Sequence, residues 1–155
     1  MARMVDIGGK PAVERLAVAA GRIRLRAATV EAIRQHKIKK GDVLAAAQLA
    51  GIQAAKRTAD IVPLCHPVPL TSLAVELSLY AGGVSVRCES RARYGTGVEM
   101  EALCGVAGAL LCVWDMVKYL EKDKTGNYPA TAIEEIRVLR KVKGKAGANR
   151  RTRSR

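Results

Sequence analysis

The sequence lacks the glycine-rich motifs of the most common nucleotide-binding sites. Neither G-x-x-x-x-G-K-[ST] nor G-x-G-x-x-G occurs in the 155 residues, which excludes a P-loop and a dinucleotide site of the Rossmann type. There is also no C-x-x-C pair among the four cysteines. A metal site needs three or four converging ligands, and Cys65 beside His66 does not have the usual ligand spacing. We therefore expect no metal, no cofactor and four reduced cysteines.

Apolar runs long enough to cross a membrane are missing as well. The stretch from Ala102 to Trp114 contains only apolar residues and glycine, but a membrane-spanning helix needs about 20 such residues. No signal-peptide pattern precedes the first charged residues. We expect a cytoplasmic protein without a membrane partner.

Aromatic residues are scarce, at 3% of the chain, and none lies in the basic C-terminal run. Residues 141–155 hold seven of the 13 net positive charges and no acidic residue. Basic tails often bind nucleic acid or simply solvate a chain, but sites for single strands add aromatic side chains that stack on the bases. Nucleic-acid binding is therefore a secondary hypothesis for the tail. The remaining positive charge favours a small anionic ligand.

What the sequence does contain is one dominant segment, from Gly95 to Lys122, which predicts a long helix. Thr96 stands three residues before Glu99, the spacing of a capping box, so Thr96 is expected as the N-cap. A helix that is apolar all round is typically buried on all sides. Gly105 and Gly108 each cost roughly 1 kcal/mol in a helix, so we expect another backbone to approach closely there.

Polar residues at the two ends of this helix are candidates for chemistry. Asp115 and Lys118 are three residues apart and share one face. Glu101 lies about 21 Å from Asp115 along the helix axis and within about 40° of it around the axis. Groups this far apart cannot share one small site within a single helix. Two antiparallel copies of the helix would bring them together.

The rest of the chain alternates strand and helix patterns. Period-two hydrophobicity predicts a first strand over 15–26 and a hairpin whose strands carry Leu73–Leu79 and Val84–Cys88. Thr29 and Asp42 are expected to cap helices that end near His36 and Lys56. A last strand is expected over 133–142. The order β-α-β-β-α-β predicts an α+β, ferredoxin-like fold with an antiparallel four-stranded sheet and helices on one face. We place one catalytic domain at 1–142 and a disordered basic tail at 143–155.

Each candidate residue also has an interpretation without function. Pro63, Pro67 and Pro69 predict a stiff extended segment for Cys65 and His66, and rigid support suits a binding site. A lone histidine is nevertheless more often a surface residue. Asp115 and Lys118 form either an exposed salt bridge or a partly buried acid/base pair.

Glu99 and Glu101 also have an interpretation without function, because acidic side chains are favoured near the positive N-terminal end of a helix dipole. Lys40, just before Gly41-Asp42, resembles the lysine of an anion site at a helix N-terminus.

Six motifs together resemble the cyclic pyranopterin monophosphate synthase family, the molybdenum cofactor biosynthesis protein C. They span most of the chain up to about Gly147. The motifs are M-V-D-I (4–7), K-G-D-V (40–43), A-G-I-Q-A-A-K-R-T (50–58), I-V-P-L-C-H-P (61–67), T-G-V-E-M-E-A-L (96–103) and D-M-V-K (115–118).

The resemblance implies a lyase that converts 3',8-cyclo-7,8-dihydro-GTP into cyclic pyranopterin monophosphate and releases pyrophosphate. It implies the fold predicted above and a hexamer, a trimer of dimers with the site at the dimer interface. By motif, Asp115 matches the catalytic aspartate and Lys118 its partner. The residues implied in substrate binding are Leu64, Cys65, His66, Met100, Glu101, Glu99, Lys40, Lys141 and Arg15.

Arg15 and Lys141 are matched through their flanking residues only. The family's Lys-x-Gly-Gly-Lys reads K-V-K-G-K at 141–145.

Two other classes of function remain open at this point. A basic-tailed nucleic-acid-binding module would bind any duplex with an affinity that falls steeply with salt. A purely structural oligomer would need no polar groups on the long helix.

Overall fold

Four antiparallel strands form one sheet in the order β2-β3-β1-β4 in the computed structural model, which describes residues 1–145. They are β1 (Val13–Arg24), β2 (Leu70–Tyr80), β3 (Gly83–Tyr94) and β4 (Ala132–Lys143). β3 lies between β1 and β2, as in a split βαβ unit. The predicted ferredoxin-like α+β fold and the β2–β3 hairpin are confirmed. Most of the predicted disordered tail, 146–155, lies outside the described residues.

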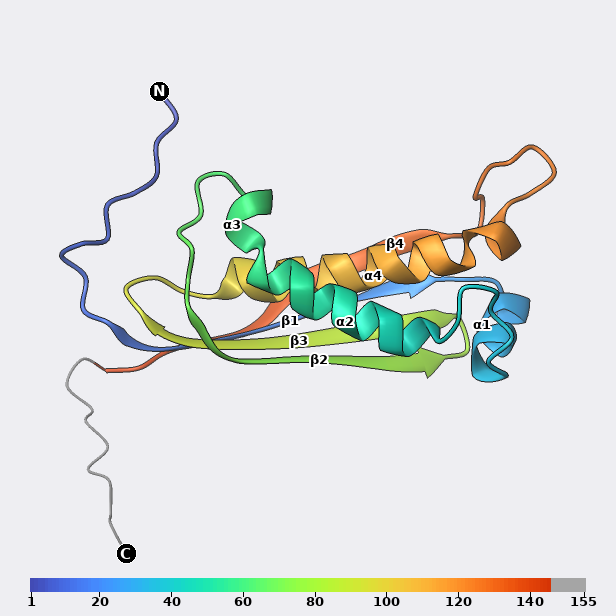
Figure 1. Ribbon diagram of the computed structural model, residues 1–155, viewed down its shortest axis with the longest axis horizontal. Helices are drawn as coiled ribbons and strands as arrows, with labels where there is room; N and C mark the ends of the chain where they lie inside the picture. Colours follow the sequence, from blue (N-terminus) through green and yellow to red (C-terminus); the bar gives the residue numbers. More distant parts are fainter. Residues whose placement is uncertain (146–155) are drawn as a thin grey trace, which may run out of the picture.

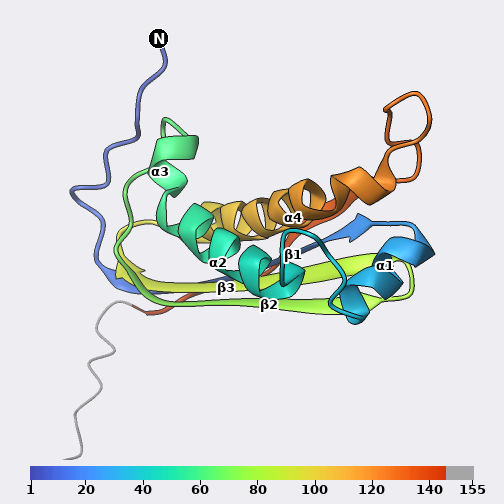
Figure 2. The same cartoon turned by 45° about the vertical axis from the view of Figure 1, so that its right-hand side comes forward.

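Two long helices, α2 (Val43–Lys56) and α4 (Glu99–Glu121), cover one face of this sheet. Two shorter helices are α1 (Ala27–Arg34) and α3 (Thr58–Ile61). Figures 1 and 2 show α2 and α4 side by side over the sheet, with α1 at one end. α3 was not predicted, because a helix of one turn is too short to show a hydrophobic period. The Thr58 hydroxyl donates to the Ala55 carbonyl at 2.9 Å and joins α3 to the end of α2.

Glycine allows α2 and α4 to approach closely, as predicted from Gly105 and Gly108. A Cβ atom added at Gly108 would lie 2.4 Å from the Ala54 Cβ. One added at Gly51 would lie 2.8 Å from the Gly105 carbonyl oxygen. Backbone contact between the helices therefore compensates for the poor helix propensity of these glycines.

Of the two N-caps predicted for α1 and α2, only that of α2 is correct. Asp42 caps α2 as predicted, since its Oδ1 accepts from the Ala45 amide at 3.0 Å. Thr29 was expected to cap α1, but it is buried inside a helix that begins at Ala27. The amide of Arg26 instead donates to Glu121 Oε1 at 3.1 Å, a contact with the far end of α4.

The predicted capping box at the start of α4 is also wrong. The helix begins at Glu99, and Val98 precedes it without a side-chain cap. Thr96 lies in the preceding bend, and the Glu99 carboxylate pairs with Lys141 of β4. Glu99 is thus paired with Lys141 of a distant strand and not with Thr96, its predicted partner three residues away.

α4 is not buried on all sides, which corrects another prediction. Its length and composition meet the criteria for a membrane span, although half of its most apolar window is buried. Its buried side packs against α2 and the sheet, which is typical of a soluble core helix. An open strip remains along α4, where Met100 is 39% and Leu111 61% exposed. The sheet and α2 cover only two sides of the helix.

Candidate active site

The residues singled out from the sequence gather at the two ends of α4. We call the hollow at its first turn the N-terminal pocket. We call the group of Lys40, Asp115 and Lys118 the Asp115 cluster. In Figure 1 the α1–α2 loop, which carries Lys40, lies at the end of the molecule opposite to the start of α4.

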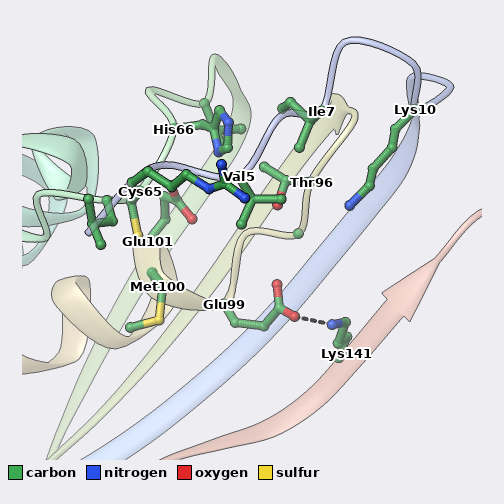
Figure 3. A pocket seen from close by; sticks show the side chains of 14 residues that line it. Val5, Ile7, Lys10, Cys65, His66, Thr96, Glu99, Met100, Glu101 and Lys141 are labelled. Atoms are coloured by element: carbon green, nitrogen blue, oxygen red, sulfur yellow. Dashed lines mark ion pairs between the residues drawn. The ribbon is translucent and has the colours of Figure 1, made fainter. Parts of the chain in front are cut away.

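The N-terminal pocket is a cavity of about 530 Å³ where four segments meet. The N-terminal stretch, the loop before β2, the start of α4 and the end of β4 form its walls (Figure 3). Its lining contains all the predicted substrate-binding residues except Lys40 and Arg15. The lining residues are Arg3, Val5, Ile7, Lys10, Leu64, Cys65, His66, Val68, Thr96, Gly97, Glu99, Met100, Glu101 and Lys141.

The loop before β2 presents Cys65 and His66 to this pocket. The Cys65 amide donates to the Val62 carbonyl at 3.0 Å, so Cys65 closes a turn and is not in the extended segment predicted for it. The chain from His66 to the start of β2 belongs to no helix or strand. Burial, followed by the nearby Glu101 carboxyl, raises the pKa of the Cys65 thiol. This thiol therefore stays protonated at neutral pH.

Glu99 is held as a carboxylate by cations around it. It forms an ion pair with Lys141, drawn as a dashed line in Figure 3. Burial acts to raise the pKa of Glu99, but the Lys141 ammonium, a backbone amide and the Arg15 charge outweigh it and lower the pKa. The Arg15 guanidinium donates to the carbonyls of Tyr94 and Gly95, each at 3.2 Å. Arg15 thus supports the turn that leads into α4.

Glu101, two residues further, has the opposite electrostatics. It is only 4% exposed, and burial, with a smaller contribution from the Glu99 charge, raises its pKa. It also lines a second cavity of about 500 Å³ beside the N-terminal pocket. A carboxyl that keeps its proton to higher pH can donate as well as accept. The pocket therefore offers one ionised and one more readily protonated carboxyl.

The Asp115 cluster joins two lysines to one carboxylate. Lys118 Nζ lies 2.8 Å from Asp115 Oδ1, and Lys40 Nζ lies 2.5 Å from Oδ2 and 3.1 Å from the Asp115 carbonyl. Hydrogen bonds from Lys118 and then Lys40 lower the pKa of Asp115 to about 2. The same contact with Asp115 raises the pKa of Lys118. The Asp115 side chain is 55% exposed, so a partly buried pair does not form within one chain.

A single chain does not bring the two sites together. Glu101 and Asp115 are both on α4, and their separation along the axis is about 21 Å. Lys40 contacts Asp115 and lies outside the N-terminal pocket. Its role at the substrate stays a prediction.

Several pocket residues near the N-terminus were not predicted from the sequence. Arg3 and Lys10 add two cations to the pocket, and Val5 and Ile7 add apolar surface. The motif M-V-D-I was a signal that residues 4–7 had a role, but no side chain in it was assigned one. Within residues 1–145, no group of three or more metal-ligating side chains converges.

The sequence model of the MoaC family matches residues 4–144 of the chain. A relative in Archaeoglobus fulgidus, named probable cyclic pyranopterin monophosphate synthase, is 54% identical over 142 residues, which cover 92% of this chain and 91% of the relative. A protein of the same name in Pyrococcus furiosus is 56% identical over 91% of this chain and 90% of its own length.

A relative in Methanothermobacter thermautotrophicus is named probable cyclic pyranopterin monophosphate synthase accessory protein. It is 55% identical over 91% of this chain and 89% of its own length.

Proposed function

The chain belongs to the MoaC family, and we propose that it is a cyclic pyranopterin monophosphate synthase of molybdenum cofactor biosynthesis. It converts 3',8-cyclo-7,8-dihydro-GTP into cyclic pyranopterin monophosphate and releases pyrophosphate, as a cytoplasmic lyase. The observation that supports this most is that three motifs far apart in sequence, containing Ile7, His66 and Glu99, line one cavity together with Lys141. A nucleic-acid-binding module is not favoured, because the family match covers the folded chain and its relatives are named as synthases.

The N-terminal pocket has the groups needed to bind the guanine-derived ring. Glu99, with its lowered pKa, is ionised at neutral pH and provides two acceptor oxygens for the N1–N2 edge of that ring. Glu101, with its raised pKa, is the better group to exchange a proton with a ring nitrogen. Leu64, Cys65, His66 and Met100 complete the wall around the ring.

We assign the proton transfers of ring opening and closure to the Asp115 cluster, with Asp115 as the base and Lys118 as the acid, the roles that the family motif implies. Within one chain the two lysines lower the pKa of Asp115 to about 2, and Asp115 raises the pKa of Lys118. Both shifts weaken these groups for proton transfer at neutral pH, so their pairing must change when substrate binds.

Closing the cyclic phosphate expels pyrophosphate, and fixed cations stabilise the charge that develops. We assign Lys40 to this role. The other two cations that the resemblance implies, Lys141 and Arg15, lie beside Glu99 and add positive charge to the N-terminal pocket side of the site.

One substrate can reach both sites only if they come from two subunits. A two-fold axis that sets two α4 helices antiparallel would place the N-terminal pocket of one chain against the Asp115 cluster of its partner. We propose that the active site forms in this way in a dimer, and that three dimers make a hexamer.

Turnover of the cyclic GTP precursor tests the function. The purified protein is incubated with 3',8-cyclo-7,8-dihydro-GTP, and pyrophosphate release is measured. Asp115→Asn should reduce turnover by roughly 10²-fold or more, because it removes the proton acceptor. Asp60→Asn, the same change at an exposed position of α3, should not reduce it. No pyrophosphate release by the unmodified protein would refute the function.

A further inference from the structure

Lys40 reaches Asp115 from a different part of the chain, so something must hold its loop in place. Residues 35–42 connect α1 to α2. Ile38 anchors the loop in the core at 6% exposure. The Gly41 amide donates to the Ile38 carbonyl at 3.0 Å, and Asp42 then caps α2. These contacts shape the loop but do not connect it to Asp115.

Tyr119 of α4 makes that connection at two points. Its hydroxyl oxygen accepts from the backbone amide of Lys39 at 3.1 Å. The Lys39 ammonium lies 5.2 Å from the centroid of the Tyr119 ring, a cation–π contact. The ring itself packs against the hydrophobic core. The residue directly before Lys40 is therefore attached to α4 through its backbone and its side chain.

Tyr119 lies on the same helix as two members of the Asp115 cluster, Asp115 and Lys118. Tyr119 follows Asp115 by four residues, one turn of α4, and is the neighbour of Lys118. A rigid helix thus carries the carboxylate, its first lysine and the anchor of the second lysine. The hydrogen bond to Lys39 fixes the loop within one residue of the ammonium that contacts Asp115.

We propose that Tyr119 is a positioning residue that holds Lys40 against Asp115. This inference rests on the proposed function for its effect on catalysis. Without the hydroxyl, the Lys39 amide loses its partner on α4 and Lys40 is free to leave the carboxylate. Asp115 then retains Lys118 as its main cation. Two further titratable groups lie near this cluster. Burial and the Asp115 charge raise the pKa of the Cys112 thiol, and Tyr128 contributes to the raised pKa of Lys118.

The kinetic test is a double-mutant cycle. Tyr119→Phe keeps the ring and removes only the hydroxyl. It should lower kcat about three- to tenfold, the range that loss of one hydrogen bond allows, with KM little changed. In a Lys40→Ala background the same change should cost nothing further, because the residue it positions is gone. Equal losses of kcat in both backgrounds, or no loss in either, would overturn the proposal.

Tyr80→Phe is the matched control. Tyr80 lies at the end of β2, and its hydroxyl makes only a 3.5 Å contact with the Ile23 carbonyl. This variant should keep the kcat of the unmodified protein.

A second measurement does not depend on activity. Carboxyl carbons of aspartate are labelled with ¹³C, and the Asp115 signal is followed from pH 6 down to the lowest pH at which the protein stays folded. In the unmodified protein and in Tyr80→Phe this signal should hardly move above pH 4, since the Asp115 pKa is about 2. In Tyr119→Phe it should begin to titrate at higher pH.

An unchanged Asp115 titration in Tyr119→Phe would overturn the proposal. If the unmodified protein releases no pyrophosphate, the proposed function fails and this titration alone decides the role of Tyr119.

Discussion

Two glutamates at the start of α4 differ in environment although they are two residues apart. Glu99 points to Lys141 and has a lowered pKa, whereas Glu101 is buried and has a raised pKa. The α-helix turns by about 100° per residue, so alternate positions face different surroundings. Sequence alone treats both as acids near a helix N-terminus.

Glu101→Gln should therefore stabilise the fold at high pH. An acid whose folded pKa lies above its unfolded value, near 4.5, makes the fold less stable as pH rises through that range. Glutamine removes this penalty, so the Tm of Glu101→Gln should exceed that of the unmodified protein at pH 8. The difference should vanish at pH 4 and below. Each kcal/mol of it moves Tm by roughly 2–4 °C in a protein of this size.

Glu99→Gln is the control with the opposite sign. Its lowered folded pKa contributes stability above pH 4.5 that is lost as pH falls. This variant should thus lower Tm at pH 8. Thermal unfolding followed by circular dichroism from pH 3.5 to 8 compares the two. A Tm of Glu101→Gln below that of the unmodified protein at pH 8 would contradict the assignment.

At the scale of the element, α4 combines a tight contact with an open strip. Gly105 and Gly108 face α2 and the sheet, while Leu111 is exposed. Asp115 and Lys118 are exposed near the end of that strip. The helix is thus a core element on one side and a potential contact surface on the other.

Gly108→Ala tests the tight side. Alanine improves helix propensity by roughly 1 kcal/mol, but its Cβ would lie 2.4 Å from the Ala54 Cβ and 3.3 Å from the Ala50 carbonyl oxygen. We expect a net loss of about 1–3 kcal/mol in the free energy of unfolding, measured by urea denaturation. Adding Ala54→Gly should recover part of the loss by removing the opposing methyl group. A gain in stability for Gly108→Ala alone would show that the helices separate easily.

At the scale of the whole molecule, the distance between the two ends of α4 decides how a site can form. Glu101 and Asp115 are about 21 Å apart along one helix. If both act on the same substrate molecule, they must come from different subunits. This requirement makes subunit complementation possible.

Two inactive variants should therefore restore activity when mixed. Glu101→Ala and Asp115→Asn proteins are unfolded and refolded together. Random pairing makes about half of the dimers mixed, each with one intact site of two, so turnover should approach about a quarter of that of the unmodified protein.

Each variant refolded alone is the control and should stay inactive. Mass spectrometry confirms that mixed dimers have formed. If they have formed and no activity returns, each site is built within one chain.

The sequence by itself determined the parts of the fold that depend on neighbours along the chain. Period-two hydrophobicity identified the hairpin, and a continuous apolar run identified the long helix. Asp42 caps α2 because the amide it accepts from is three residues away. Helix glycines indicated close backbone packing, which α2 supplies. Most candidate site residues came from family motifs, and the cavity gathers the majority of them.

Only the tertiary structure decided which distant groups meet. Thr29 and Thr96 do not act as caps, since α1 begins at Ala27 and Val98 precedes α4. Glu121 and Lys141 instead reach the two helix starts from elsewhere in the fold.

Lys40 contacts Asp115, which is 75 residues away, and no local pattern predicted this contact. The local sequence pattern predicts which side of a helix or strand is buried. It does not predict contacts between residues that are tens of positions apart, because those depend on how the sheet and the helices pack.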